Sequence, residues 1–232
     1  MLATFNINKK IAPFNKLITI DGDKSLSIRW ALLASQAIGT SKAYKLLQSE
    51  DVLNTLKCLK KLGIKIKLKN DYCEIIGRGL NGYKYKDNLS LDAGNSGTLG
   101  RLILGLLVHA KKKIKLTGDR SLSKRDFSRV TEPLSKFNAK FYFKKKNKLP
   151  LSILGSKFVK PINYHEDKGS AQCKSSVMLA ALNTSGETNI RAKKSRNHTE
   201  LLFKYLKIPI KIKKTKKYDF IKINGKKDIK SF

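Results

Sequence analysis

The sequence predicts an α/β (α+β) domain of three βαβαββ repeats in a pseudo-threefold arrangement, with helices central and short sheets outside. The same order of elements recurs with a period of roughly 70 residues. The first helix of each repeat is the more apolar one, which suits a central position. Each of these helices follows a β-rich run and a polar turn that carries glycine.

The first repeat, about residues 15–77, begins with a β-rich run at 17–20 and a helix at about 24–37. In this helix Leu26, Trp30, Leu33 and Ala37 share one face. A second strand at 41–47, a helix capped by Asp51, and two alternating runs at 64–68 and 72–76 complete the unit.

The second and third repeats, about 88–155 and 160–224, repeat this order. The second has strands at 89–91 and 114–117, helices at 96–110 and 128–137, a loop at 118–126, and a hairpin of 139–143 with 149–154. The third has strands at 162–164 and 188–191, helices at 170–182 and 199–206, and a hairpin of 208–212 with 218–223. Residues 15–226 are therefore expected to form one domain, with residues 227–232 as a tail.

The formal net charge of +33 is extreme, but the chain is 41% hydrophobic, as expected for a globular protein. A basic balance of this kind is typical of nucleic-acid binders. However, only 8 of the 50 basic residues are arginine, lysine is spread along the chain, and no nucleic-acid-binding motif or aromatic-interleaved basic stripe is visible. We therefore interpret the charge as compositional drift and do not expect nucleic acid as a partner, whereas small anionic substrates are compatible with it.

The three cysteines, Cys58, Cys73 and Cys173, are widely spaced without a CxxC pair, which fits neither a disulfide framework nor a zinc site. The three histidines are scattered as well, so no metal site is expected. The longest apolar run, 102–108, is too short to cross a membrane, and the N-terminus lacks a secretion signal. These features predict a cytoplasmic protein with no membrane partner.

The most informative stretch is 91–107, a strand, a glycine-rich turn and an apolar helix with Arg101 in its first turns. The free N–H groups of a helix start attract anions, and glycine lets a ligand approach the backbone. An ordinary capped helix remains the alternative for this stretch alone. The three first helices begin in the same way, at Gly22-Asp23-Lys24-Ser25, Gly94-Asn95-Ser96-Gly97-Thr98 and Gly169-Ser170-Ala171-Gln172.

In a threefold arrangement these helix starts would converge on one ligand. The sparse arginines strengthen this hypothesis, because Arg29, Arg101, Arg125 and Arg196 all lie in or beside the motif segments. Arginine offers the two-pronged recognition of carboxylate or phosphate that lysine lacks. We interpret His198 as a capping or packing residue rather than a catalytic one.

Five segments together resemble the EPSP synthase (3-phosphoshikimate 1-carboxyvinyltransferase) family, in its order and spacing and over essentially the whole chain. They are Gly22-Asp23-Lys24-Ser25-Leu26-Ser27-Ile28-Arg29, Gly94-Asn95-Ser96-Gly97-Thr98, Gly118-Asp119-Arg120-Ser121-Leu122-Ser123-Lys124-Arg125, Gly169-Ser170-Ala171-Gln172-Cys173-Lys174-Ser175 and Ser195-Arg196-Asn197-His198-Thr199-Glu200.

The resemblance implies transfer of the enolpyruvyl group of phosphoenolpyruvate to the 5-hydroxyl of shikimate 3-phosphate, on the route to chorismate and the aromatic amino acids. It implies no cofactor, and the family's two domains, each of three βαβαββ units, agree with the repeats. Residues matching the shikimate-3-phosphate site are Lys24, Ser25, Arg29, Ser170, Ala171, Gln172 and Ser195. Residues matching the phosphoenolpyruvate site are Lys24, Asn95, Gly97, Arg125 and Gln172, with Lys24 as the catalytic residue.

The chain departs from the family in length, because members run to about twice its size and carry the general base in a second domain. It resembles the N-terminal half only, whether as a fragment, a partial gene or one piece of a split enzyme. A separate C-terminal-half polypeptide is then a possible partner, and the chain alone is expected to be inactive. Residues 1–14 are expected to pack on the missing domain. Asn197 and Trp30 also differ from the residues usual in the family.

Two alternative functions are considered. The sister enolpyruvyl transferase that acts on UDP-N-acetylglucosamine would show Lys-Asn in place of Lys24-Ser25 and a cysteine in the loop around 115–125, and neither is present. The second alternative is an inactive basic module that binds anions or nucleic acid on the same scaffold.

Overall fold

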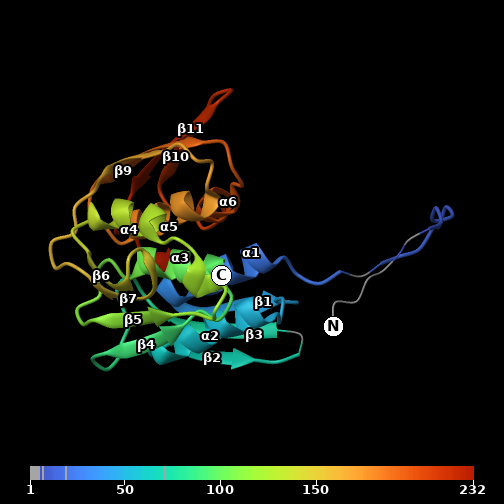
Figure 1. The fold of residues 1–232 in the computed structure, drawn as a ribbon, viewed down its shortest axis with the longest axis horizontal. Helices are drawn as coiled ribbons and strands as arrows, with labels where there is room; N and C mark the ends of the chain where they lie inside the picture. Colours follow the sequence, from blue (N-terminus) through green and yellow to red (C-terminus); the bar gives the residue numbers. More distant parts are fainter. Residues whose placement is uncertain (1–5, 7, 19, 71) are drawn as a thin grey trace.

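The computed structural model describes residues 6, 8–18, 20–70 and 72–232. It contains three successive groups of elements (Figure 1). The first comprises α1 (Lys24–Gln36), β1 (Ala37–Tyr44), α2 (Glu50–Lys61), β2 (Lys65–Leu68) and β3 (Tyr72–Arg78). The second comprises β4 (Leu89–Asp92), α3 (Gly97–Leu106), β5 (Ile114–Thr117), the 3-10 turn η1 (Leu122–Lys124), α4 (Ser128–Ser135), β6 (Lys140–Lys145) and β7 (Lys148–Leu154). The third comprises β8 (Asn163–Glu166), α5 (Ala171–Leu182), β9 (Glu187–Lys193), α6 (His198–Tyr205), β10 (Ile210–Lys214) and β11 (Tyr218–Asn224), and β12 (Ile229–Lys230) follows.

Each group forms a four-stranded sheet with the same topology, and in the first sheet the fourth strand is β12 from the end of the chain. The strand orders are β12-β1-β3-β2, β4-β5-β7-β6 and β8-β9-β11-β10. In every sheet the first strand of the order runs parallel to the second, and the remaining neighbours are antiparallel. The predicted fold class, three βαβαββ-type units with sheets around central helices, is therefore confirmed.

The first sheet corrects two expectations from the sequence. Residues 17, 18 and 20 are irregular and exposed, so the predicted strand at 17–20 is wrong for the described residues, and Thr19 lies outside them. Its place beside β1 is taken by β12, with Ala37 opposite Ile229 and Ile38 opposite Lys230. The expected tail at 227–232 is therefore part of the sheet. A β-rich run forms a strand only where a neighbouring strand offers it partners, and that edge of β1 is already occupied.

The last residues are held by further contacts to the first repeat. The N–H of Lys42 donates to the carbonyl of Phe232 at 2.8 Å. The Phe232 ring meets Trp30 edge-on, with centroids 6.5 Å apart, so the unusual tryptophan has a packing partner. By contrast, residues 6 and 8–14 are exposed and follow an extended path away from the rest of the molecule (Figure 1). Whether another domain covers them stays a prediction.

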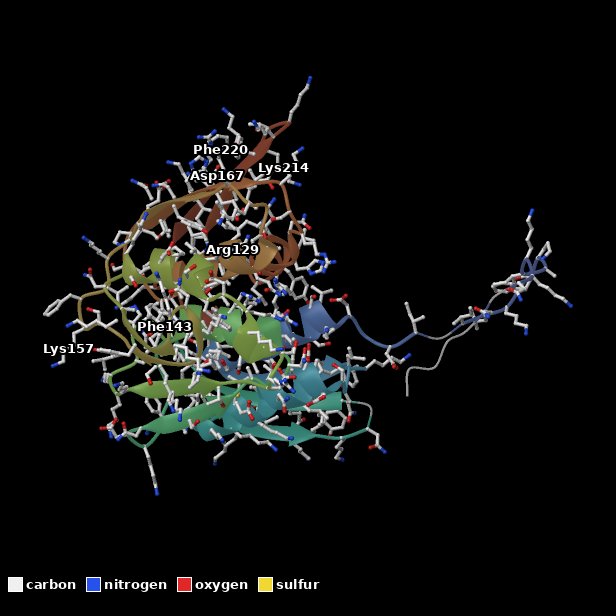
Figure 2. The ribbon with its side chains drawn as sticks, viewed as in Figure 1. Arg129, Phe143, Lys157, Asp167, Lys214 and Phe220 are labelled. Atoms are coloured by element: carbon white, nitrogen blue, oxygen red, sulfur yellow. The ribbon has the colours of Figure 1, made fainter. Side chains whose placement is uncertain are left out.

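The central helices α1, α3 and α5 form the middle of one continuous hydrophobic core. Residues 173–182 of α5 are all buried. α3 and α5 approach so closely that a Cβ added at Gly105 would overlap the carbonyl oxygen of Ser176. Exposed lysines such as Lys157 and Lys214 project from the periphery (Figure 2). The burial of the three helices brings their starts to one end of the core.

Candidate anion-binding site

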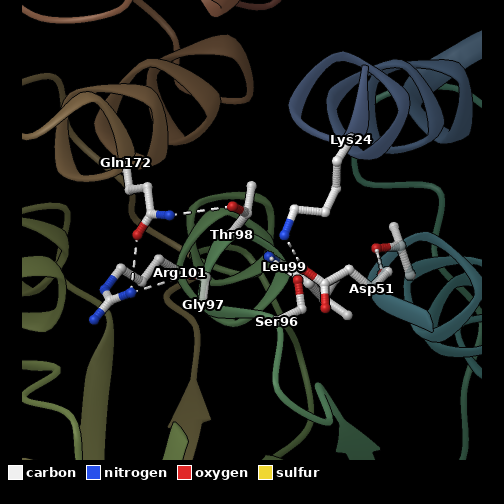
Figure 3. Close-up of polar contacts among 9 residues, drawn as sticks. Lys24, Asp51, Ser96, Gly97, Thr98, Leu99, Arg101 and Gln172 are labelled. Atoms are coloured by element: carbon white, nitrogen blue, oxygen red, sulfur yellow. Dashed lines mark hydrogen bonds and ion pairs between the residues drawn. The ribbon is translucent and has the colours of Figure 1, made fainter. Parts of the chain in front are cut away.

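The three central helices begin beside one another (Figure 3). Each has a side-chain N-cap: Asp23 accepts from the N–H of Leu26, Ser96 from Leu99 and Ser170 from Cys173. Gln172 in the first turn of α5 connects to α3, because its amide nitrogen donates to Thr98 Oγ1 at 3.1 Å. Its amide oxygen accepts from Arg101 Nη1 at 2.8 Å. These contacts fix the starts of α3 and α5 against each other.

Two guanidinium groups lie over the first residue of α3. A Cβ added at Gly97 would lie 2.8 Å from Arg101 Nη1 and 2.9 Å from Arg125 Nη1. Arg101 also stacks on the ring of Phe127, with its Cζ 5.2 Å from the ring centroid. Burial lowers the pKa of Arg101, with Arg125 among the smaller causes, yet a guanidinium stays charged in proteins. Two like charges this close, above free helix N–H groups, form a place suited to an anion.

The loop that carries Arg125 is tied to the turn before α3 by Asp119. Its N–H donates to the carbonyl of Gly94 at 2.9 Å, and its carboxylate accepts from Asn95 Nδ2 and from the N–H of Leu122, each at 2.6 Å. The hydrogen bonds from Leu122 and Asn95 lower the pKa of this exposed carboxyl group. The structure therefore brings Asn95, Gly97 and Arg125 together, as the sequence predicts.

Lys24, the first residue of α1, reaches across to α2. Its Nζ lies 3.0 Å from Asp51 Oδ2, and the two side chains are 52% and 18% exposed. The sequence interpretation of Asp51 as a helix cap is wrong, because the N-cap is Ser49 and Asp51 lies inside the helix. Its carboxylate instead faces Lys24, a contact between distant segments that no local pattern signals.

Arg29 lies deeper, below the first turn of α1. Its side chain donates to Thr199 Oγ1 at 2.8 Å, to Ser175 Oγ at 3.1 Å and to the carbonyl of Ser25 at 3.0 Å. Burial lowers its pKa to about 10, which leaves it positively charged at neutral pH. Arg29 therefore joins α1, α5 and α6 beneath the helix starts, so its role in this state is at least partly structural.

A second buried contact joins α5 to α6, between Lys174 Nζ and Glu200 Oε1 at 2.5 Å. Removing one partner of a buried ion pair is strongly destabilising, so this pair fixes how the two helices sit. Around the start of α6, the hydroxyl of Ser195 and Nδ1 of His198 are buried without a hydrogen-bond partner among the described residues. The Ser195 hydroxyl is therefore available to a ligand, whereas the Ser170 hydroxyl is already engaged as the cap of α5.

The site thus assembles Lys24, Asn95, Gly97, Arg125 and Gln172 at the helix starts. Ser25, Arg29, Ser170, Ala171 and Ser195 lie on or beside the same α1, α5 and α6 ends. Sequence reasoning missed Asp51 and Asp119 as site residues. Asp119 had a usable signal, since an aspartate directly after Gly118 is typical of a turn that bonds its own backbone.

No group of three or more His, Cys, Asp or Glu residues suited to a metal ion occurs in the described part of the chain. Within those same residues, no helix is long and apolar enough to cross a membrane.

The fold and the site define an α/β domain of three repeats with a place suited to an anion at the converging starts of its central helices. A family model described as EPSP synthase (3-phosphoshikimate 1-carboxyvinyltransferase) matches residues 8–232. The chain therefore belongs to the EPSP synthase family.

Individual relatives agree. A 3-phosphoshikimate 1-carboxyvinyltransferase of Streptococcus mutans serotype c is 45% identical over 189 residues, which are 81% of this chain and 44% of the relative. One of Thermoanaerobacter sp. (strain X514) is 40% identical over 216 residues, 92% of this chain and 50% of the relative. The solved EPSP synthase of Acinetobacter baumannii superimposes with a TM-score of 0.84 at 34% identity, over 92% of this chain and 48% of that one. The chain spans about half the length of these relatives.

Proposed function

We propose that this chain supplies the substrate-binding half of a 3-phosphoshikimate 1-carboxyvinyltransferase. The reaction transfers the enolpyruvyl group of phosphoenolpyruvate to the 5-hydroxyl of shikimate 3-phosphate and releases phosphate. The observation that carries the proposal is the pair of guanidiniums, Arg101 and Arg125, over Gly97 and beside Gln172. Together they suit a small molecule with both a phosphate and a carboxylate group.

Phosphoenolpyruvate would lie on the α3 side of the site. Arg125 would pair with its negative groups, the bare backbone at Gly97 would let it approach the helix start, and Asn95 and Gln172 would donate amide hydrogens. Lys24 would leave Asp51, to which it forms a single contact at 3.0 Å, and reach the same anion. An exposed ion pair of this kind contributes only about 0–1 kcal/mol, so a doubly charged phosphate can replace the carboxylate.

Shikimate 3-phosphate would lie on the α1 and α5 side. Lys24 and Ser25 at the start of α1, with the backbone of Ser170 and Ala171 at the start of α5, would hold its phosphate. The unpartnered hydroxyl of Ser195 supports a polar contact from the α6 side. Arg29, below the first turn of α1, would also contact shikimate 3-phosphate, and Gln172 would contact both substrates.

The chemistry explains why cations predominate. Protonation of the methylene carbon of phosphoenolpyruvate makes C2 electrophilic, and the 5-hydroxyl adds to C2 as it loses its proton. The tetrahedral intermediate then loses phosphate from C2 and a proton from the new methyl group, which restores the carbon–carbon double bond. Two phosphates and a carboxylate must be held close together throughout. Fixed cations and helix N-termini offset their repulsion and set their geometry, and this is the part of catalysis that this chain supplies.

The general base is assigned to a separate C-terminal-half polypeptide or domain. The three cysteines are unpaired, which fits a reducing compartment, and we assign the protein to the cytoplasm.

The test is a titration of the purified chain with shikimate 3-phosphate, followed by amide chemical shifts, beside an assay for phosphate release with both substrates. We expect shifts at the starts of α1 and α5 and no turnover. Lys24→Met is expected to weaken binding, while Lys61→Met, a surface lysine of α2, serves as the charge-matched control. Phosphate release by the chain alone would contradict its assignment as the binding half. A titration without any shift would contradict the assignment of the substrate.

A further inference from the structure

The outer face of the third sheet carries an arrangement of side chains that the site does not use. Paired residues on neighbouring strands share a face, so the strand register defines rows across the sheet. One row runs Lys213, Phe220, Arg191, His165, and the next runs Lys211, Lys222, Asn189, Asn163. These eight residues, the basic-aromatic rows, come from β10, β11, β9 and β8 in that spatial order.

The rows contain four lysine or arginine residues and neither aspartate nor glutamate. Two acids lie beside them, and each pairs with one member: Glu187 with Lys222 at 3.1 Å, and Asp167 with His165 at 2.9 Å. Lys211, Lys213 and Arg191 have no acidic partner among the ion pairs of the described residues. The face therefore presents cations available to an anionic ligand.

An aromatic surface lies among these cations. Phe220 is 40% exposed in the interior strand β11. Beside it, Tyr218 is stacked with Arg191, whose Cζ lies 4.2 Å from the ring centroid. Figure 2 labels Phe220, Asp167 and Lys214 at this sheet. A depression of about 300 Å³ is bordered by Asn163, His165, Asn189, Arg191, Phe220 and Lys222. It combines a ring for stacking with amide and imidazole groups for hydrogen bonds.

The other two sheets also carry exposed rings and cations, but in a different arrangement. On the first sheet, Tyr44 of the interior strand β1 is 72% exposed and pairs with Tyr72, and Lys69 Nζ lies 5.3 Å from the Tyr72 ring centroid. On the first sheet, the row Lys67, Glu74, Lys42 includes an acid that pairs with Lys42 at 3.3 Å. On the second, the row Tyr142, Ser152, Lys115, Ser90 has one cation. Among the described sheets, only the third places an exposed ring of an interior strand between two cations of the same row, with Phe220 between Lys213 and Arg191.

We propose that the basic-aromatic rows bind single-stranded nucleic acid, with a base stacked on Phe220 and phosphates held by Lys211, Lys213 and Arg191. Sheet faces with exposed aromatics recognise single strands in this way, because every base has a face for stacking and each phosphate needs a cation. The basic-aromatic rows cannot be recognised in the sequence, because their residues are spread over positions 163–222 and come together only in the sheet.

The test measures fluorescence anisotropy of labelled twelve-residue oligouridylate and oligothymidylate with the intact chain, between 50 and 300 mM salt. Phe220→Ala is expected to weaken binding about tenfold, since one stacked base is lost. The double variant Lys211→Gln/Lys213→Gln is expected to lower the slope of log K against log salt by about 1.4, because each phosphate contact on a single strand contributes about 0.7.

The matched controls are Tyr142→Ala in β6 and Lys113→Gln/Lys115→Gln, in and just before β5 of the second sheet, where Lys113 Nζ lies 4.4 Å from the Tyr142 ring centroid. These controls likewise remove one exposed ring and two positive charges from the chain. We expect them to change the affinity for the oligonucleotide by less than twofold and the slope of log K against log salt by less than about 0.3. Equal losses in both sets would show diffuse attraction and overturn the proposal. The proposal would also be overturned if the chain did not bind oligonucleotides but bound anionic lipid vesicles, and Phe220→Ala weakened the binding to vesicles. Thermal melting checks that each variant folds.

Discussion

Replacing Gly97 by alanine tests the anion site at its centre. The added methyl group would stand 2.8 Å from Arg101 Nη1 and 2.9 Å from Arg125 Nη1. Comfortable contacts of this kind begin near 3.4 Å, so both guanidiniums must retreat by roughly 0.6 Å. They are the ends of flexible side chains and can do so, but they then leave the space in which phosphoenolpyruvate is proposed to bind.

The size of the effect follows from one weakened charge-assisted hydrogen bond. Such bonds contribute about 1.5–3 kcal/mol, so we expect phosphoenolpyruvate to bind about tenfold more weakly. Shikimate 3-phosphate, held at the starts of α1 and α5, is expected to change less than twofold. The free energy of unfolding should stay equal or rise by up to about 1 kcal/mol, since alanine favours a helix over glycine.

The assay is calorimetric titration of the chain with each substrate, with phosphoenolpyruvate added in the presence of shikimate 3-phosphate. Gly100→Ala, one turn further along α3, is the control. Its Cβ would meet Phe127, Ala93 and Leu122 at 3.5–3.6 Å, which are ordinary contacts. If Gly97→Ala left the affinity for phosphoenolpyruvate unchanged, or if Gly100→Ala lowered it as much, the placement of this substrate over α3 would be refuted.

Three further predictions concern packing and titration. Gly105→Ala should lower the free energy of unfolding by about 1–3 kcal/mol, because its Cβ would overlap the backbone oxygen of Ser176; calorimetric melting measures this. Burial raises the pKa of the Cys58 and Cys73 thiols to about 11, so Ellman's reagent at pH 8 should react with them only after unfolding. Burial also lowers the pKa of His109 below its usual 6.5, so below pH 6.5 the unfolded state binds more protons and stability falls with decreasing pH. His109→Gln should flatten that part of a plot of melting temperature against pH.

Much of the fold is predictable from the sequence because its signals are local and repeated. Apolar spacing along a helix and alternation along a strand act within a few turns, and three copies of the same order reinforce one another. The strand wrongly predicted at 17–20 depends instead on a contact between distant segments. A four-residue β-rich run carries no information about its partner, and the strand beside β1 comes from Ile229–Lys230 at the far end of the chain.

The candidate site, like the fold, is only partly predictable from the sequence. The glycine turn around Gly97 and the arginines of the motif segments can be predicted from the sequence, because recognition of phosphate or carboxylate favours particular residue types. Their partners are not visible: Lys24 meets Asp51 of the next helix, and Arg29 meets Thr199 across 170 positions. Such pairs depend on how whole helices pack, which no spacing rule within one segment encodes.

In the structure, the polar side chains of the candidate anion site contact one another. Asp51 faces Lys24, Asp119 accepts from Asn95, and Gln172 accepts from Arg101. A substrate anion must therefore exchange these contacts for its own rather than enter an empty cage. The free energy gained in each exchange is only the difference between the new hydrogen bond and the one it replaces. Affinity therefore depends on the extra negative charge that a phosphate has over a carboxylate or an amide. For this reason we expect the candidate site to bind ligands with several negative charges more tightly than singly charged carboxylates of similar size.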